Sequence, residues 1–490
     1  MNQPSLPATI PNWIDGKECA AVSGETFGKL SPDSGRKLCD VVRSDSRDVQ
    51  HAIQAARSAQ PAWAELTPVQ RGDILHEIAQ ALRQHQNEMA AIVAMETGMS
   101  FNAALGETGG AIAEGEFTAG EGRRFYGRTT TSAVPNKYAM TVRQPLGVAG
   151  LIIAANTPIA NVAWKVFPAL VCGNAAVLKA AEDTPATAWF FARIAHEVGL
   201  PAGVLNVIQG QGPEAGAPLV SDPDVAVISF TGSTAVGRRI ASIAGERLAK
   251  VSLELGGKNP LVVCDDADLE AAAKWVLLSA FSNAGQRCAS GSRIIVFDAV
   301  YDRFRDMLVE RTEQLKVGPG NDDDLGPVIN EKQIANMLGA VEAAKQKGAV
   351  ILTGGHRLND DSHAAGFYMA PTLIENVDPR DDISTNELFG PITCLYRVAN
   401  FQEALQLAND SPYGLTACIH TLNFHRAIEF SRKVQAGVAV VNAGTFGSEP
   451  HMPFGGLKQS GNGTREPGTE ALDVYSDLKN IIINVDPEKL

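Results

Sequence analysis

Two short segments contain side chains that could act on a substrate. Glu254 stands in an apolar run directly before a pair of glycines. A carboxylate held away from water has a raised pKa and can serve as a general base near neutral pH. Cys288 lies between two small residues, Gly285 and Ala289, which leave room for a substrate. Its thiolate would be a nucleophile wherever the surroundings lower the usual thiol pKa of about 8.5.

Each of these segments also has an ordinary interpretation. Glu254 could be a surface acid at the end of a strand, and a lone cysteine such as Cys288 is more often a small buried apolar residue. A third segment, 230–237, leaves an apolar run and opens a helical one, where free N–H groups favour a phosphate. It lacks the GxGxxG fingerprint, so spacing alone favours a well-capped turn over a phosphate site.

The pattern of apolar residues predicts which elements position these segments. Helical spacing predicts helices over 46–63 and 67–95, so that the first hundred residues are mainly helical. From residue 146 onward, short apolar runs alternate with helix-length segments. The predicted strands are 146–154, 175–179, 204–208, 225–230, 260–264, 292–297 and 350–352, and the predicted helices are 159–171, 185–198, 214–220, 269–282, 300–315 and 331–347. This alternation indicates βαβ units with parallel sheets covered on both faces, and therefore an α/β fold of two doubly wound domains.

Length and charge exclude several classes of protein. A chain of 490 residues has room for about three domains of ordinary size. Lys and Arg number 42 against 55 Asp and Glu, a net charge of −13, so we expect no nucleic-acid partner. The uncharged stretch 144–164 contains Pro158 and two asparagines, and we read it as a strand, a loop and a helix with no membrane span.

Targeting and cysteine signals indicate the compartment. Residues 1–11 lack the basic start and the apolar run of a signal peptide. The 7 cysteines form no CxxC pair and their number is odd, which favours a reducing, cytoplasmic location. The 9 histidines show no metal-ligand spacing, so we propose no metal site.

Seven short motifs occur together along the chain, and their joint occurrence is more informative than any one of them. In order they are Asn156-Thr157-Pro158, Lys179 with Glu182, Phe230-Thr231-Gly232-Ser233, Glu254-Leu255-Gly256-Gly257-Lys258, Gly285-Gln286-Arg287-Cys288, Glu387-Leu388-Phe389-Gly390-Pro391 and Pro453-Phe454-Gly455-Gly456. From Asn12 onward the chain resembles the NAD(P)-dependent aldehyde dehydrogenase superfamily, in its hydrolytic, semialdehyde dehydrogenase-like form.

The resemblance implies a role for four catalytic residues. Cys288 would attack the aldehyde to form a thiohemiacetal, and the amide of Asn156 with the backbone N–H of Cys288 would hold the developing oxyanion. Hydride transfer would leave a thioester, which Glu254 would hydrolyse by activating water. Lys179 would reach the adenosine ribose and influence the thiol by its charge.

The resemblance also implies a cofactor site. The implied binding residues are Lys179, Glu182, Phe230, Gly232, Ser233, Gly237, Leu255, Glu387 and Phe389. Ser233 would contact the pyrophosphate, and Glu387 would hold the ribose on the nicotinamide side. Because the charge of Glu182 would repel a 2′-phosphate, NAD is favoured over NADP.

A substrate tunnel is implied by three further segments. They supply Arg124, Asn161, Trp164, Phe446, Ser448 and His451 as candidate substrate-binding residues. Thr157 replaces the family's usual aromatic, so a wider and more polar tunnel mouth is expected. Polar and basic groups outnumber aromatics, which favours a short, polar or anionic semialdehyde. A pair of arginines at 123–124 that points to solvent is the ordinary alternative.

The domain division and the competing functions follow from the same resemblance. We expect an NAD-binding domain over 1–128 and 143–253, a catalytic domain over 254–460, and an oligomerisation element over 129–142 and 476–490, which implies a homodimer or homotetramer. A CoA-acylating aldehyde dehydrogenase is one alternative, although that branch typically lacks the base at Glu254. A catalytically silent, NAD-binding structural relative is the other.

Overall fold

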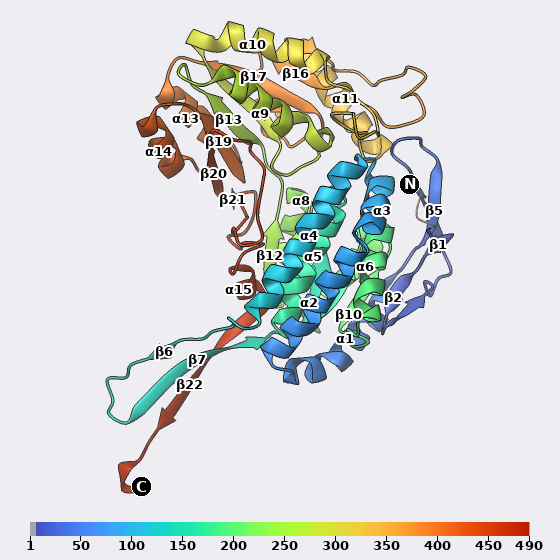
Figure 1. The fold of residues 1–490 in the computed structure, drawn as a ribbon, viewed down its shortest axis with the longest axis vertical. Helices are drawn as coiled ribbons and strands as arrows, with labels where there is room; N and C mark the ends of the chain where they lie inside the picture. Colours follow the sequence, from blue (N-terminus) through green and yellow to red (C-terminus); the bar gives the residue numbers. More distant parts are fainter. Residues whose placement is uncertain (1–5, 490) are drawn as a thin grey trace.

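The N-terminal segment is built of short strands. The computed structural model describes residues 6–489, and Figure 1 shows its arrangement. Strands β1 (Thr9–Ile10), β5 (Lys37–Val42) and β4 (Thr26–Leu30) form a three-stranded sheet in that order. The prediction of a mainly helical first hundred residues is therefore wrong for residues 9–42. The strands are short and are separated by turns, with positive φ at Gly16, Gly24 and Gly35, so no long apolar period marks them.

Four helices follow this segment. They are α1 (Ser46–Glu65), α2 (Pro68–Gln84), α3 (Gln86–Thr97) and α4 (Phe101–Glu121). Capping boxes start α1 at Asp45 and α2 at Thr67, because in each case the cap side chain and the third helical residue satisfy each other's free N–H. The helix predicted over 67–95 is interrupted at His85, which caps α2 and precedes α3.

The first large sheet contains the four strands predicted over 146–154, 175–179, 204–208 and 225–230, with three further strands that were not predicted. Its order is β12 (Lys250–Glu254), β11 (Val225–Thr231), β8 (Val148–Ile152), β9 (Ala175–Lys179), β10 (Leu205–Ile208), β2 (Asn12–Ile14) and β3 (Lys17–Cys19). The first five strands are parallel, and β2 and β3 add an antiparallel edge. One face packs on α5 (Pro158–Val171) and α6 (Pro185–Glu197), which α2 and α4 cover in turn, and the other packs on α1, α7 (Ala217–Ser221) and α8 (Thr234–Glu246). The helix predicted over 214–220 is a π-helical turn, η1 (Gly212–Gly216), followed by α7.

The second large sheet is built in the same way. Its order is β15 (Val350–Thr353), β16 (Thr372–Glu375), β17 (Ile392–Val398), β14 (Gly291–Phe297), β13 (Asn259–Val263), β19 (Thr416–His420) and β20 (Val438–Val441), and all pairs except β15·β16 are parallel. Helices α9 (Leu269–Phe281) and α10 (Asp298–Glu313) pack on one face, and α11 (Glu331–Gln346), α13 (Phe401–Asn409) and α14 (Phe424–Lys433) on the other. The α/β fold with two doubly wound sheets is therefore confirmed.

A long two-stranded arm leaves the body of the molecule. Strands β7 (Lys137–Pro145) and β22 (Ser476–Asn484) pair along their whole length, with β6 (Thr129–Thr130) at one edge. Figure 1 shows this arm extending away from both sheets, with the C-terminus beyond its tip. It exposes large apolar side chains, among them Tyr138, Leu478 and Ile482.

The remaining elements are small. They are η2 (Ser282–Gly285), α12 (Asp382–Thr385), the two-stranded pair β18 (Tyr413–Gly414) and β21 (Leu457–Lys458), α15 (Ala471–Tyr475) and η3 (Pro487–Lys489). Within residues 6–489, no helix is both long enough and apolar enough to cross a membrane.

Candidate active site

The two large sheets meet through a short connection that carries the first candidate residue. Glu254 is the last residue of β12, and Asn259 opens β13, so residues 255–258 cross directly from one sheet to the other. Carboxyl ends of strands in the first sheet therefore lie next to amino ends of strands in the second. Lys179, at the carboxyl end of β9, and the Cys288 loop, directly before β14, belong to these two edges.

The loop that holds Cys288 has a strained, tightly enclosed backbone. Asn283 and Ala284 adopt left-handed conformations (φ 55° and 52°), and the Nδ2 of Asn283 donates to the backbone oxygen of Asn156 at 3.1 Å. Gly285 also has positive φ, and a Cβ there would lie 2.1 Å from the backbone oxygen of Gly390. Only glycine fits at this position. The loop is thereby tied to the Asn156 segment of the first sheet.

The thiol of Cys288 lies in a mixed environment. Its backbone oxygen accepts a hydrogen bond from Asn259 Nδ2 at 2.8 Å, which fixes the loop on β13. Burial, with the negative charges of Glu387 and Glu254, raises the pKa of the Cys288 thiol to about 12, whereas N–H groups of Ala289 and Cys288 lower it. A raised pKa favours the protonated thiol, so a base that accepts its proton would assist the attack of the sulfur.

Glu254 is buried without a partner. It is 5 % exposed, and within residues 6–489 neither carboxylate oxygen has a hydrogen-bond partner. Burial, followed by the charge of Glu466, raises its pKa well above the ordinary value, while Lys165 and Arg465 oppose the rise. A carboxyl group with both oxygens free and a raised pKa is suited to accept a proton near neutral pH.

Behind Glu254 lies a buried polar network that the sequence interpretation missed. Lys165 Nζ contacts Glu466 Oε2 at 2.8 Å and Ser229 Oγ at 2.6 Å, and Ser252 Oγ contacts Glu466 Oε1 at 3.0 Å. Both charged side chains are 1 % exposed. A lysine within the otherwise apolar helix α5 was the available signal, since a buried cation needs an acid.

The predicted adenosine-side residues lie around the ends of β9 and β11. Lys179 Nζ is 2.9 Å from Glu182 Oε1, and the same oxygen accepts from the Gly212 N–H at 2.6 Å. Burial lowers the pKa of Lys179. Ser233 is the N-cap of α8 but makes no side-chain cap bond, so its hydroxyl remains able to bind a ligand at that helix end. These groups fit a ribose diol and a diphosphate.

Four further cofactor candidates pack closely in the same region. A Cβ at Gly232 would lie 2.4 Å from the Phe230 ring, and a Cβ at Gly237 would lie 2.5 Å from Leu255 Cδ2. The glycines therefore allow Phe230 and Leu255 to cover the start of α8.

Glu387 and Phe389 lie on the side of Cys288. Glu387 Oε1 accepts from the Gly257 N–H at 3.0 Å, and a Cβ at Gly256 would lie 2.0 Å from Glu387 Oε2. Burial raises the pKa of Glu387 to about 7. Glu387 and Phe389 line a cavity of about 20 Å³ together with Gly257 and Arg287. The glycine pair after Glu254 thus admits the carboxylate of Glu387.

The predicted substrate residues divide into two groups. Trp164, Phe446 and Cys288 pack around the small apolar cluster of Ala289, Leu415 and Phe454. Ser448 Oγ belongs to the same segment as Phe446 and is buried without a partner within residues 6–489. Asn161 is turned back on its own helix, where its Nδ2 donates to Thr157.

Arg124 and His451 form the second group. Arg124 contacts Glu121 at the end of α4, and its side chain is 51 % exposed. His451 lies 3.9 Å from Glu449, and its side chain is 59 % exposed. The solvent-exposed interpretation of the arginine pair therefore fits the observed geometry, because Arg123 contacts the exposed Asp73.

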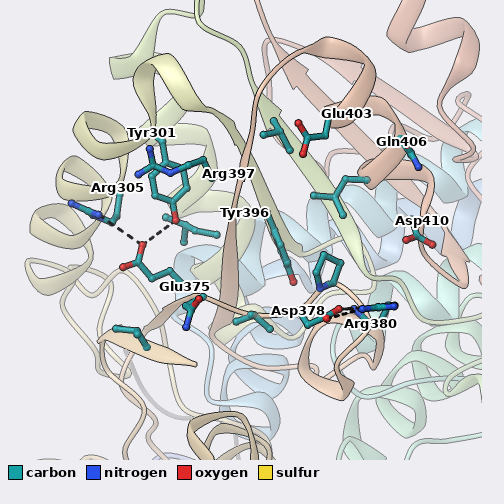
Figure 2. A pocket seen from close by; sticks show the side chains of 17 residues that line it. Tyr301, Arg305, Glu375, Asp378, Arg380, Tyr396, Arg397, Glu403, Gln406 and Asp410 are labelled. Atoms are coloured by element: carbon teal, nitrogen blue, oxygen red, sulfur yellow. Dashed lines mark hydrogen bonds and ion pairs between the residues drawn. The ribbon is translucent and has the colours of Figure 1, made fainter. Parts of the chain in front are cut away.

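A large cavity lies elsewhere in the second domain. It measures about 990 Å³ and opens at the carboxyl ends of β16 and β17, the opposite edge of the sheet from Cys288. Figure 2 shows its charged side chains contacting one another, such as Glu375 with Tyr301 and Arg305. None of the predicted site residues lines it.

Comparison with known proteins agrees with this geometry. The model of the aldehyde dehydrogenase family matches residues 20–481. The chain is 38% identical to an alpha-ketoglutaric semialdehyde dehydrogenase of Bacillus subtilis, over 97% of this chain and 98% of the relative. It is 39% identical to a mitochondrial aldehyde dehydrogenase of Leishmania tarentolae, over 96% and 93% of the two chains.

Solved structures show the same fold. A crystal structure of betaine aldehyde dehydrogenase from Staphylococcus aureus, in complex with NAD+, superposes with a TM-score of 0.95 at 32% identity, covering 98% of this chain and 95% of that one. A related structure of that enzyme, with the same TM-score and identity and covering 98% and 96%, contains a BME-modified cysteine. With the family match over nearly its whole length, this chain belongs to the aldehyde dehydrogenase family and is an oxidoreductase that acts on the aldehyde group.

Proposed function

We propose that the chain uses NAD to oxidise a short, polar or anionic semialdehyde to the carboxylic acid. The observation that carries the proposal is the pairing of an unbonded, buried Glu254 with a thiol whose pKa it influences, Cys288. The semialdehyde substrate of the Bacillus subtilis relative and the NAD+ of the Staphylococcus aureus structure support the choice of substrate and cofactor.

The first half of the reaction uses Cys288. A base removes the thiol proton, and the sulfur adds to the aldehyde carbon to form a thiohemiacetal. The N–H groups directed at the sulfur, from Ala289 and Cys288, stabilise the thiolate. The oxyanion that develops would accept from the amide of Asn156, whose segment is tied to the Cys288 loop by Asn283. NAD, when bound, supplies the hydride acceptor that turns the thiohemiacetal into a thioester.

The second half uses Glu254. Water attacks the thioester carbon, Glu254 accepts the water proton, and the sulfur leaves as thiolate with release of the acid. A raised pKa places this carboxyl closer to the operating pH and strengthens it as a base. The charges of the Lys165–Glu466 pair act on Glu254: Glu466 raises the pKa of Glu254 and Lys165 lowers it. The two ions therefore help to set the basicity of Glu254.

Cofactor preference follows from Glu182. Its carboxylate lies beside Lys179 and accepts from Gly212, an arrangement that suits a ribose diol and repels a 2′-phosphate. We therefore expect NAD to be preferred over NADP. The two sheets and the arm support the proposed division into cofactor-binding, catalytic and oligomerisation parts.

The arm supports a homodimer or homotetramer. β7 and β22 stand away from the body with exposed apolar side chains, and a two-stranded ribbon alone is marginally stable in water. A second copy would bury that surface. A reducing, cytoplasmic compartment fits cysteines that are all free.

The test is a substrate panel on the purified enzyme, followed by NADH absorbance. We expect anionic semialdehydes to be oxidised with higher kcat/KM than neutral aliphatic or aromatic aldehydes, with NAD and without CoA. Preference for neutral aldehydes would contradict the substrate class. Acceleration by CoA would favour the acylating alternative, and NAD binding without turnover of any aldehyde would favour the silent relative.

A further inference from the structure

An arginine that the sequence interpretation left without a role stands next to the nucleophile. Arg287 directly precedes Cys288, in the loop between η2 and β14. Its guanidinium lies 4.6 Å above the ring of Phe446, which itself packs with Trp164 and Cys288 around the apolar cluster described above. Arg287 therefore belongs to the wall of the substrate side of the site.

This guanidinium is not neutralised by a protein acid. Its Nη1 donates to Ser282 Oγ at 2.8 Å, but within residues 6–489 no carboxylate lies within ion-pair distance of it. By contrast, Arg123, Arg124 and Arg397 each contact an acid. Arg287 is half-buried and has no ion-pair partner, so a bound anion would stabilise its positive charge.

The nearest acidic influence on Arg287 comes from Glu107, which is already engaged. Glu107 Oε1 accepts from the N–H groups of Ile159 and Ala160 at the start of α5, at 2.9 and 3.2 Å. Burial raises the pKa of Glu107 to about 8, which disfavours its charged form, and the charge of Arg287 opposes this rise. The positive charge of Arg287 remains available on the substrate side.

We propose that Arg287 is the specificity-determining residue that binds the distal carboxylate of an anionic semialdehyde while Cys288 attacks its aldehyde end. This inference rests on the proposed function. The planar guanidinium offers parallel N–H donors that match a carboxylate, and its stacking on Phe446 holds it in one orientation. Ser448, whose hydroxyl is buried without a partner in the Phe446 segment, supplies a further donor on the same wall.

Position in the chain favours a substrate that reaches both groups. Arg287 and Cys288 are neighbours, and both border the Phe446 cluster, so one small molecule would meet the guanidinium at one end and the thiol at the other. A neutral aldehyde gains no ion pair from the guanidinium. The anchor therefore favours anionic substrates.

The experiment compares 4-oxobutanoate with butanal, its uncharged counterpart of equal length, using the full-length enzyme with saturating NAD. In Arg287→Gln we expect the ratio of kcat/KM values, 4-oxobutanoate over butanal, to fall about 30-fold, chiefly through a higher KM for the anion. Arg287→Lys keeps the positive charge but loses the parallel N–H donors of the guanidinium. We expect its ratio to lie between that of Arg287→Gln and that of wild type. Arg397→Gln, which removes another arginine stacked on an aromatic ring but far from Cys288, is the matched control.

The outcomes separate this inference from the proposed function. If wild type itself prefers butanal, the anionic substrate class is wrong. If wild type prefers 4-oxobutanoate but Arg287→Gln keeps its ratio, or loses both activities equally, the anchor is wrong while the class stands. Should Arg287→Gln unfold, as judged by its melting temperature, the ratio measured for Arg287→Lys decides: an unchanged ratio overturns the anchor and a reduced one supports it.

Discussion

The active site and the large cavity of the second domain differ in how their polar groups are satisfied. Figure 2 shows that Arg380 contacts Asp378 in the large cavity and that Glu375 accepts from Tyr301. Arg397, which also lines the cavity, contacts Asp298 outside it. At the active site, Glu254 has two buried oxygens without partners and Arg287 has no ion-pair partner, within the part of the chain described, residues 6–489. These charged groups of the large cavity are paired with one another or with neighbouring residues, whereas Glu254 and Arg287 at the active site are not.

This contrast shows why volume alone is a poor guide to function. A buried polar group without a partner destabilises the fold by about 1–3 kcal/mol, so it persists only where something compensates. Substrate, water and cofactor supply that compensation in a catalytic site. The pairs around the large cavity need no ligand, and each exposed pair contributes at most about 1 kcal/mol. The predictions below test this difference at both places.

The largest effect is expected from Cys288→Ala. Loss of the sulfur removes the covalent intermediate, so aldehyde oxidation should fall by at least about 10⁴-fold. NAD binding, measured by calorimetry, should change little because Lys179, Glu182 and Ser233 are untouched. Residual turnover within a factor of ten of wild type would show that another group is the nucleophile.

Glu254→Gln should act on the second half of the reaction. Gln keeps the size of the side chain but accepts no proton, so thioester hydrolysis should slow by about 10²–10⁴-fold. Rapid mixing should then show a burst of NADH followed by a slow steady rate. Equal slowing of burst and steady phases would place Glu254 in the first half of the reaction and contradict its role as the hydrolytic base.

The same variant should be more stable than wild type at alkaline pH. The folded-state pKa of Glu254 is raised above its unfolded value of about 4.3, so its favourable contribution is complete below about pH 4 and is lost as pH rises through the folded pKa. We expect Glu254→Gln to melt higher than wild type at pH 9, by the equivalent of about 1–3 kcal/mol, with the gap closing toward pH 5. Glu310→Gln, at an exposed position, is the control. If the difference in melting temperature between the variant and wild type stayed constant from pH 5 to pH 9, ionisation of Glu254 would not destabilise the folded state.

The sequence predicted the interior of the fold better than its edges. β9 was predicted with its observed bounds because four apolar residues, 175–178, form one run between Asn174 and Lys179. Strands at 9–42 were missed because each is short, and half-exposed strands such as β4 show no clean alternation.

Short sequence motifs predicted only part of the site. The roles proposed for Glu254 and Cys288 came from a set of motifs, each tied to its own short segment. Lys165 and Glu466 lie 301 positions apart in the sequence and meet only in the folded chain. Arg287 and Phe446 are likewise far apart in sequence and meet only in the folded chain. Lys165 in an apolar helix signals only that a buried cation needs an acid, and the neighbours of neither residue reveal which partner it meets.

Glu182→Gln should have a moderate effect on cofactor choice. Removing the charge beside Lys179 lowers the repulsion of a 2′-phosphate and weakens the hold on a ribose diol, so the NAD/NADP ratio of kcat/KM should fall by about tenfold. Steady-state kinetics with both cofactors at one aldehyde concentration measure this. Glu197→Gln, on the exposed end of α6, should leave the ratio at the wild-type value. An unchanged ratio in Glu182→Gln would move cofactor selection to another residue.

Arg397→Gln at the large cavity should have the smallest effect. The substitution removes contacts to Asp298 and Asp302 and the stack on Tyr301 at 4.1 Å. Because these side chains are 43–62% exposed, water replaces most of what is lost, and the melting temperature should fall by no more than about 2 °C. kcat/KM for aldehyde should stay within about twofold of wild type, since the cavity lies at the other edge of the sheet from Cys288. A tenfold loss of activity with an unchanged melting temperature would show that Arg397 affects catalysis from this cavity. The contrast between a cavity whose charges are paired and a catalytic site whose polar groups are not would then no longer hold.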